Sequence, residues 1–158
     1  MTDPKTPYDE RLRLWEATVP KAIRRDRLWG LRLYRLGVWL GDLVWEDVTV
    51  LHRDGRTRRV ADQLFRAVGS ISANVAEGYS RGSGKDRARF YEYALGSARE
   101  ARDWYFKARH RLGEDVAADR IEVLSDVIRL SLGLVRKQPG RTLREPTEDY
   151  FPDAPDVS

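Results

Sequence analysis

The chain has 158 residues, of which 41% are hydrophobic and 34% are charged. This length favours one domain, and the apolar fraction is high enough for a buried core, which excludes a wholly disordered chain. The absence of cysteine excludes disulfide frameworks, thiolate zinc sites and cysteine nucleophiles. The net charge of +4 is unevenly distributed, since residues 1–10 carry −2, residues 141–158 carry −3 and residues 11–140 therefore carry +9.

The basic body predicts a polyanionic partner, because concentrated positive charge recruits phosphate. A solvated basic face without a ligand is the alternative, and the 24 arginines against 5 lysines could reflect genomic base composition. The longest apolar stretch, at residues 37–45, is too short to span a bilayer, and the N-terminus lacks the pattern of a signal peptide. We therefore expect a cytoplasmic protein with no membrane contact.

The chain divides into a body and two terminal segments. Residues 1–25 form an N-terminal extension that contains three prolines and a predicted short amphipathic helix around residues 9–19. Leu12, Trp15 and Val19 would share one face of that helix. Residues 139–158 combine prolines with acidic residues and are expected to form a mobile tail.

Apolar residues recur with helical spacing in four segments of the body, residues 26–138, at about 26–52, 57–78, 84–112 and 115–137. Thr57 is the expected N-cap of the second helix, and Gly78 is expected to take the left-handed conformation at its end. Gly113 closes the third helix. Four long helices with short connections predict an all-α, up-down-up-down antiparallel four-helix bundle.

The apolar faces of these helices are wider than one bundle interior needs, with Trp39, Trp45 and Trp104 as candidate outliers. Such a surplus predicts burial against another subunit. The alternative is that these tryptophans are partly exposed on a monomer, as large aromatic side chains often are.

The loop at residues 78–86 contains several glycines, but its spacing and Asp86 do not match a nucleotide-hydrolysing phosphate loop. Arg81 and Lys85 could still hold a phosphate near a helix N-terminus, against the alternative of a plain connection. The two histidines are too few to fix a metal. Because no nucleophile or second base accompanies Glu77, we predict no catalytic residues, no metal, no cofactor and no enzymatic activity.

Small residues occur on the second and third helices. A glycine inside a helix costs about 1 kcal/mol relative to alanine, so Gly69 and Gly96 indicate a close approach of these two helices. Ser70, Ser97 and Asn74 would then form hydrogen bonds across the seam.

These residues also carry a family resemblance. The matching positions are Gln63, Arg66, Ala67, Ser70, Ile71, Asn74, Val75, Ala76, Glu77, Gly78, Tyr79, Arg81, Phe90, Tyr91, Ala94, Gly96, Ser97 and Glu100. This pattern resembles the signature of the 23S ribosomal RNA intervening-sequence proteins, a four-helix-bundle family, over about residues 28–138. The structural motif residues in it are Ser70, Asn74, Glu77, Gly78, Gly96 and Ser97.

The resemblance implies more than a fold. The family includes the accessory variability determinant of diversity-generating retroelements, whose relatives form homopentamers with basic surfaces that bind nucleic acid and a reverse transcriptase. It therefore implies a cyclic homopentamer here and a reverse transcriptase as a partner. The N-terminal extension, the acidic tail and the arginine-rich linker at residues 53–59 depart from the family pattern.

We therefore predict a non-enzymatic, oligomeric accessory protein that binds RNA or DNA, with RNA favoured. A scaffold that engages an acidic protein partner through the same basic surface is the alternative. The predicted phosphate contacts are Arg24, Arg25, Arg56, Arg58, Arg59, Arg81 and Lys85, because they lie in or beside loops.

Overall fold

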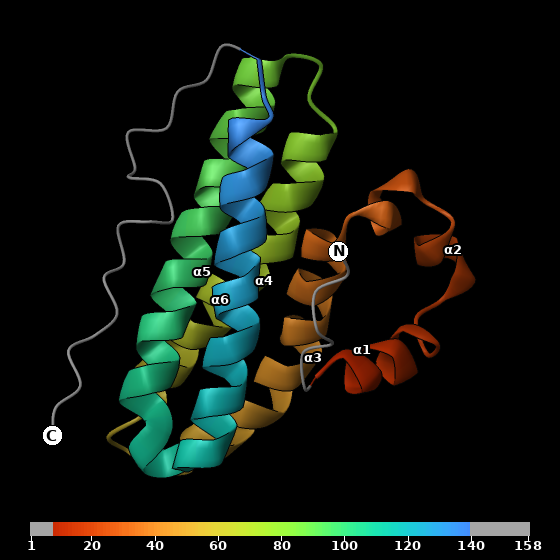
Figure 1. Ribbon diagram of the computed structural model, residues 1–158. Coiled ribbons are helices and arrows are strands. Elements are labelled where there is room, and N and C mark those ends of the chain that lie inside the picture. Colours follow the sequence, from red (N-terminus) through yellow and green to blue (C-terminus); the bar gives the residue numbers. More distant parts are fainter. Residues whose placement is uncertain (1–7, 140–158) are drawn as a thin grey trace, which may run out of the picture.

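A computed structural model describes residues 8–139 of the chain, and every regular element in this range is a helix (Figure 1). The elements are α1 (Asp9–Glu16), α2 (Lys21–Arg24), a 3₁₀ helix (Arg27–Gly30), α3 (Arg32–Leu51), α4 (Arg58–Tyr79), α5 (Gly84–Leu112) and α6 (Glu114–Arg136). The prediction of an all-α fold is confirmed. Apart from Pro139, the predicted acidic tail lies outside the described residues.

The four long helices α3–α6 lie side by side, and the chain reverses direction at each of the connections between them (Figure 1). Each helix packs mainly against its neighbour in sequence, while α3 also contacts α5 and α6. The core between them is aliphatic on α4 and α6, and on α3 it also includes Trp39. On α5 it consists largely of alanines, including Ala94, Ala98 and Ala101, which let neighbouring helices approach closely.

The short elements before α3 form an arm, residues 8–30, that contacts α3 through α1 and the 3₁₀ helix, whereas α2 stands farther out (Figure 1). Tyr8, Leu12 and Val19 of this arm are buried, as the amphipathic pattern predicts for the last two. Trp15 packs against the core from a partly buried position. The N-terminal extension is therefore packed through α1, whereas residues 20–27 are exposed.

The first predicted body helix is divided, so its single span over residues 26–52 was wrong. Asp26 begins a 3₁₀ helix by accepting a hydrogen bond from the Leu28 backbone N–H, at 2.9 Å from Oδ1 to N. After Gly30, Leu31 is extended at φ −78° and ψ 114°, and α3 begins only at Arg32. The apolar residues keep a helical spacing from Trp29 to Leu33, so the hydrophobic pattern did not reveal the break at Leu31.

Thr57 lies at the N-cap position of α4, but its side chain does not cap that helix. Its hydroxyl instead donates to the carbonyl oxygen of Leu51 at 2.6 Å. The hydroxyl therefore links the start of α4 to the last residue of α3, and the predicted capping role of this side chain was wrong.

The predicted roles of Gly69, Gly78 and Gly96 were also wrong, whereas Gly113 closes α5 as predicted. Gly78 is helical and buried inside α4, and Gly113 is the single glycine with a positive φ among the described residues, at 95°. A Cβ on Gly69 or Gly96 would meet no atom within 4 Å, so neither glycine lies at a helix–helix contact. The helices instead approach closely at Gly78 on α4 and Gly37 on α3.

The predicted polar seam between α4 and α5 is absent at two of its three positions. The Ser70 hydroxyl donates to the Arg66 carbonyl, and the Asn74 amide donates to the Ser70 carbonyl, so both bond within α4. Ser97 lies half-buried on α5. The side chains of Ser70 and Asn74 therefore do not fix the register of the two helices.

We expect the substitution Gly78→Ala to lower the free energy of unfolding by about 1–3 kcal/mol, the usual cost of overpacking. A Cβ at this position would lie 2.9 Å from Cε1 of Tyr91, a ring that is buried between α4 and α5. Urea denaturation followed by circular dichroism measures the change. Gly69→Ala is the matched control, and it should be neutral or slightly stabilising because its new methyl group meets open space. Equal effects of the two substitutions would contradict the close approach at Gly78.

Candidate nucleic-acid interface

The α3–α4 connection and the α5–α6 turn lie at the same end of the long helices (Figure 1). This arginine-rich end carries Arg53, Arg56, Arg58, Arg59, Arg109 and Arg111. The pKa of Asp54 in the connection is held well below its usual range, chiefly by hydrogen bonds from Arg56 and also by the charge of Arg111. Arg111 at the end of α5 is therefore close enough to act electrostatically on the α3–α4 connection.

Two of these arginines have carboxylate partners. Arg56 donates to both oxygens of Asp54, at 3.1 and 2.7 Å, and Arg109 lies 3.5 Å from Glu114. The other four, Arg53, Arg58, Arg59 and Arg111, are exposed and have no carboxylate partner among residues 8–139. This end of the protein thus presents four guanidinium groups to solvent that are uncompensated in the sense that none forms an ion pair among the described residues, although the charge of Arg111 also acts on Asp54.

The start of α4 adds to the positive potential. Its first turn holds Arg58 and Arg59 and no acidic residue, and no side chain caps it. The first N–H groups of a helix lack intrahelical partners and form the positive end of its dipole, so cations there are unfavourable and anions are favourable. A phosphate at this end would satisfy N–H groups and arginines together.

The remaining predicted contacts lie elsewhere. Arg81 and Lys85 flank the α4–α5 loop, which is at the other end of the 22-residue helix α4, about 33 Å away at 1.5 Å per residue. Arg81 pairs with Glu77 and lies over the Phe90 ring, 4.8 Å from its centroid. The structure therefore does not bring these residues together with Arg56, Arg58 and Arg59.

Arg24 and Arg25 form a third location, because they end α2 on the arm. Both are exposed, and the Arg24 Nε donates to the Val19 carbonyl at 2.9 Å. Sequence reasoning placed no contact at Arg109 or Arg111. The sequence did hold a signal for these two residues. Both precede Gly113, where α5 ends, and in an up-down order of helices this end of α5 lies beside the connection between α3 and α4.

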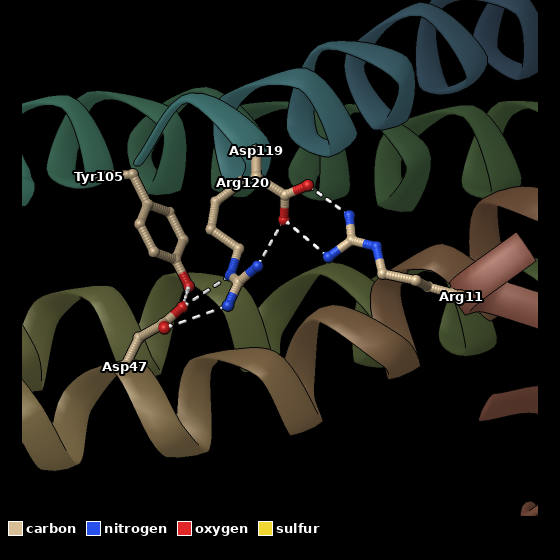
Figure 2. Close-up of polar contacts among 5 residues, drawn as sticks. All are labelled: Arg11, Asp47, Tyr105, Asp119 and Arg120. Atoms are coloured by element: carbon tan, nitrogen blue, oxygen red, sulfur yellow. Dashed lines mark hydrogen bonds and ion pairs between the residues drawn. The ribbon is translucent and has the colours of Figure 1, made fainter. Parts of the chain in front are cut away.

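Sequence reasoning also missed a buried polar network between α3, α5 and α6 (Figure 2). Asp47 accepts a hydrogen bond from the Tyr105 hydroxyl at 2.8 Å and two from the Arg120 guanidinium, at 2.8 and 3.2 Å. Arg120 also pairs with Asp119, which in turn binds Arg11 of the arm. The network links the arm to the core.

The two central side chains of this network are buried and bonded within it. The carboxylate of Asp47 and the guanidinium of Arg120 are both nearly inaccessible, at 7% and 12% side-chain exposure. The carboxylate oxygens of Asp47 bond to Arg120 and Tyr105, and the guanidinium nitrogens of Arg120 bond to Asp47 and Asp119 (Figure 2). Burial raises the pKa of Tyr105 well above its usual value, and the charge of Asp47 acts in the same direction.

We expect this shift to make the protein alkali-sensitive. The unfolded chain ionises Tyr105 near pH 10, whereas the folded chain holds its proton to higher pH. The contribution of the protonated Tyr105 to the free energy of unfolding is therefore fully present below about pH 10, and it is lost as the pH rises toward the folded-state pKa. Urea denaturation between about pH 9 and 11 measures the slope. Tyr105→Phe should reduce this slope, whereas Tyr93→Phe, at a ring that is 52% exposed, should leave it unchanged.

An open groove of about 820 Å³ runs between α3 and α4 on the outer side. Trp45 and Phe65 contribute exposed aromatic rings to it, with centroids 6.0 Å apart, and Gly69 and Ala73 leave part of its floor without long side chains. Among residues 8–139, no three His, Cys, Asp or Glu side chains gather as metal ligands. No helix in the same range is long and apolar enough to cross a membrane.

Comparisons with known proteins agree with the fold. A solved structure from Bacteroides thetaiotaomicron, a protein of unknown function from the S23 ribosomal protein family, is similar with a TM-score of 0.62 and 15% sequence identity. The similarity covers 66% of this chain and 98% of that one. No curated protein matches the chain. The model of the family described as 23S rRNA-intervening sequence protein matches residues 31–127, which is more than half of the chain, so the chain belongs to this family.

Proposed function

We propose that the protein is a non-enzymatic, nucleic-acid-binding accessory protein with RNA as its preferred ligand. The observation that carries the proposal is the set of four uncompensated arginines, Arg53, Arg58, Arg59 and Arg111, at the arginine-rich end. A guanidinium group can hold two phosphate oxygens at once and can stack on an unpaired base. Membership of an rRNA-related family supports RNA over DNA.

The proposal includes assembly. We infer that α3–α6 act as an antiparallel four-helix bundle and that five copies form a ring, a number that rests on the family resemblance. The exposed aromatic side chains Trp45, Phe65, Tyr93 and Phe106 support self-association, because they leave apolar area that a second copy would cover. A ring would repeat each arginine-rich end around its axis and strengthen the field that attracts phosphate.

A reverse transcriptase is the protein partner that the resemblance favours, and the cytoplasm is the expected location. The same exposed aromatic side chains also support the alternative function as a scaffold, because they could contact another protein as well as a second copy of this chain. A scaffold would use the arginine-rich end for an acidic protein and would not bind RNA.

Fluorescence anisotropy with a labelled RNA hairpin, repeated from about 50 to 200 mM salt, tests the proposal. We expect binding that weakens steeply, with a logarithmic slope that grows by about 0.7–0.9 for each phosphate neutralised. Four arginines per protomer therefore predict a slope of about −3 or steeper. Absence of binding to hairpin RNA and to single-stranded DNA at low salt would favour the scaffold.

Light scattering on the same samples tests assembly independently. The expected mass is near five times the 18.3 kDa of one chain. A monomer at micromolar concentration would contradict the ring while leaving the RNA result to be judged separately.

A further inference from the structure

A second pocket, of about 420 Å³, lies where the arm meets α3 and α6. Its walls combine three tryptophan rings and one leucine with three charged side chains. The lining residues are Trp15, Trp39, Leu43, Trp45, Asp42, Glu46 and Arg120. This composition is unlike that of the arginine-rich end, because aromatic rings and carboxylates replace uncompensated guanidinium groups.

One aromatic wall of the pocket, Trp45, suits a cation. Trp45 is 64% exposed, whereas Trp39 is almost fully buried and its ring already carries the Arg11 guanidinium, 5.5 Å from the centroid. Trp15 is half-buried, and its Nε1–H donates to Asp42 Oδ2 at 2.6 Å, which fixes the orientation of the ring. Indole is the aromatic side chain that attracts cations most strongly, through the negative potential over its face.

The charges around the pocket favour a cation as well. Of the charged side chains that line the pocket, Asp42 and Glu46 carry carboxylates and Arg120 carries a guanidinium group, so negative charge is in excess by one. The Arg120 guanidinium does not neutralise the rim, because Asp47 and Asp119 already hold it (Figure 2). Glu46 is exposed and has no ionic partner among residues 8–139.

We propose that this pocket binds the head group of an organic cation, a guanidinium or alkylammonium group such as an arginine side chain presents. The cation would lie on the Trp45 ring, with the Glu46 carboxylate and the second oxygen of Asp42 beside it. Charge-assisted hydrogen bonds from a guanidinium group to carboxylates are among the stronger polar contacts in proteins. The proposal does not depend on nucleic-acid binding.

The source of the cation is either a second copy of this chain or a separate molecule. Trp45 also lines the apolar groove between α3 and α4, so an arginine of a neighbouring copy could enter the pocket from a subunit contact at that groove. A free cation or another protein would reach the pocket without self-association. The chemistry of recognition is the same in each case.

The test uses the full chain labelled with 5-fluorotryptophan, whose five tryptophans give separate fluorine NMR signals. Choline chloride and Nα-acetyl-arginine amide are the cationic probes, and 3,3-dimethylbutanol is the neutral isostere of choline. We expect both cations to shift the Trp15 and Trp45 signals in a saturable manner, at constant ionic strength. The neutral isostere should not shift them.

Two variants and a matched control locate the site. Trp45→Ala should weaken cation binding by about two- to thirty-fold, and Glu46→Gln by up to about five-fold. Trp104→Ala should have no effect, because that ring lies on α5 and already carries Lys107 at 4.8 Å. Trp45 is exposed, so its substitution should preserve the helical circular dichroism spectrum.

Dilution distinguishes the two sources. If a second copy supplies the cation, apparent probe affinity falls as protein concentration rises, and Glu46→Gln lowers the mass measured by light scattering. If the source is separate, probe affinity is independent of protein concentration. Equal shifts by the neutral isostere, or no shift at any protein concentration together with an unchanged mass in Glu46→Gln, would overturn the proposal and leave RNA binding untouched.

Discussion

Asp47→Ala should lower the free energy of unfolding by about 3–5 kcal/mol, the usual cost of leaving a buried charge without its partner. The Asp47 carboxylate accepts two hydrogen bonds from Arg120 and one from Tyr105. Without it, the buried Arg120 guanidinium keeps Asp119 alone as its charged partner, and the Tyr105 hydroxyl loses its acceptor. Urea denaturation followed by circular dichroism measures the loss.

Asp103→Ala is the matched control for this substitution. Asp103 pairs with Lys107 one turn away at 2.5 Å, and both side chains are more than half exposed. Exposed pairs of this kind contribute about 0.3–0.5 kcal/mol. If Asp47→Ala were no more destabilising than Asp103→Ala, the network would not be what fixes α3 against α5 and α6.

Reversing the charge of Arg53, Arg58 and Arg59 together to glutamate should weaken RNA binding on the order of a hundredfold or more at low salt. The salt slope should also fall by about 2–3 units, since each lost phosphate contact removes about 0.7–0.9. These side chains are exposed and none has a carboxylate partner among the described residues, so the fold should not change. Anisotropy against the same RNA hairpin gives both quantities.

The triple substitution Arg13→Glu, Lys21→Glu, Arg27→Glu on the arm changes the net charge by the same amount. These side chains are also exposed, but they lie away from the arginine-rich end. We expect a small loss of affinity from this control, through long-range repulsion alone. Equal losses in the two triple variants would mean that total charge, and not the arginine-rich end, attracts RNA.

Much of the fold could be predicted because local signals agreed with packing. The apolar spacing on α5 and α6 and the glycine at position 113 gave the boundary between these helices almost to the residue. The break at Leu31 could not be predicted, because the apolar spacing continues through it. The close helix approach was predicted at Gly69 and lies at Gly78, which was predicted to end its helix. A sequence does not show which face of a helix meets which neighbour.

The candidate site was predicted only in part, because the sequence gives loops and helix ends but not the side chains that meet there. Arg58 and Arg59 lie where the connection was expected. Arg111 was not singled out, although the predicted up-down order of the helices places it at the same end as Arg58 and places Arg81 at the other end. Asp47 left a signal that could have been used. It interrupts an apolar stripe that includes Val44 and Leu51, and a carboxylate in such a place indicates a buried cationic partner.

The contact between Arg11 and Asp119 bears on where the folding unit begins. The family match starts at residue 31, yet Tyr8 is buried and bonds Asp126, and Arg11 completes the pairing of Asp119. A chain that started at the family boundary would expose the Trp39 ring, which now lies beneath Tyr8 and Arg11. The packed core of this protein therefore extends beyond the residues that the family model matches, to Tyr8 at the start of α1.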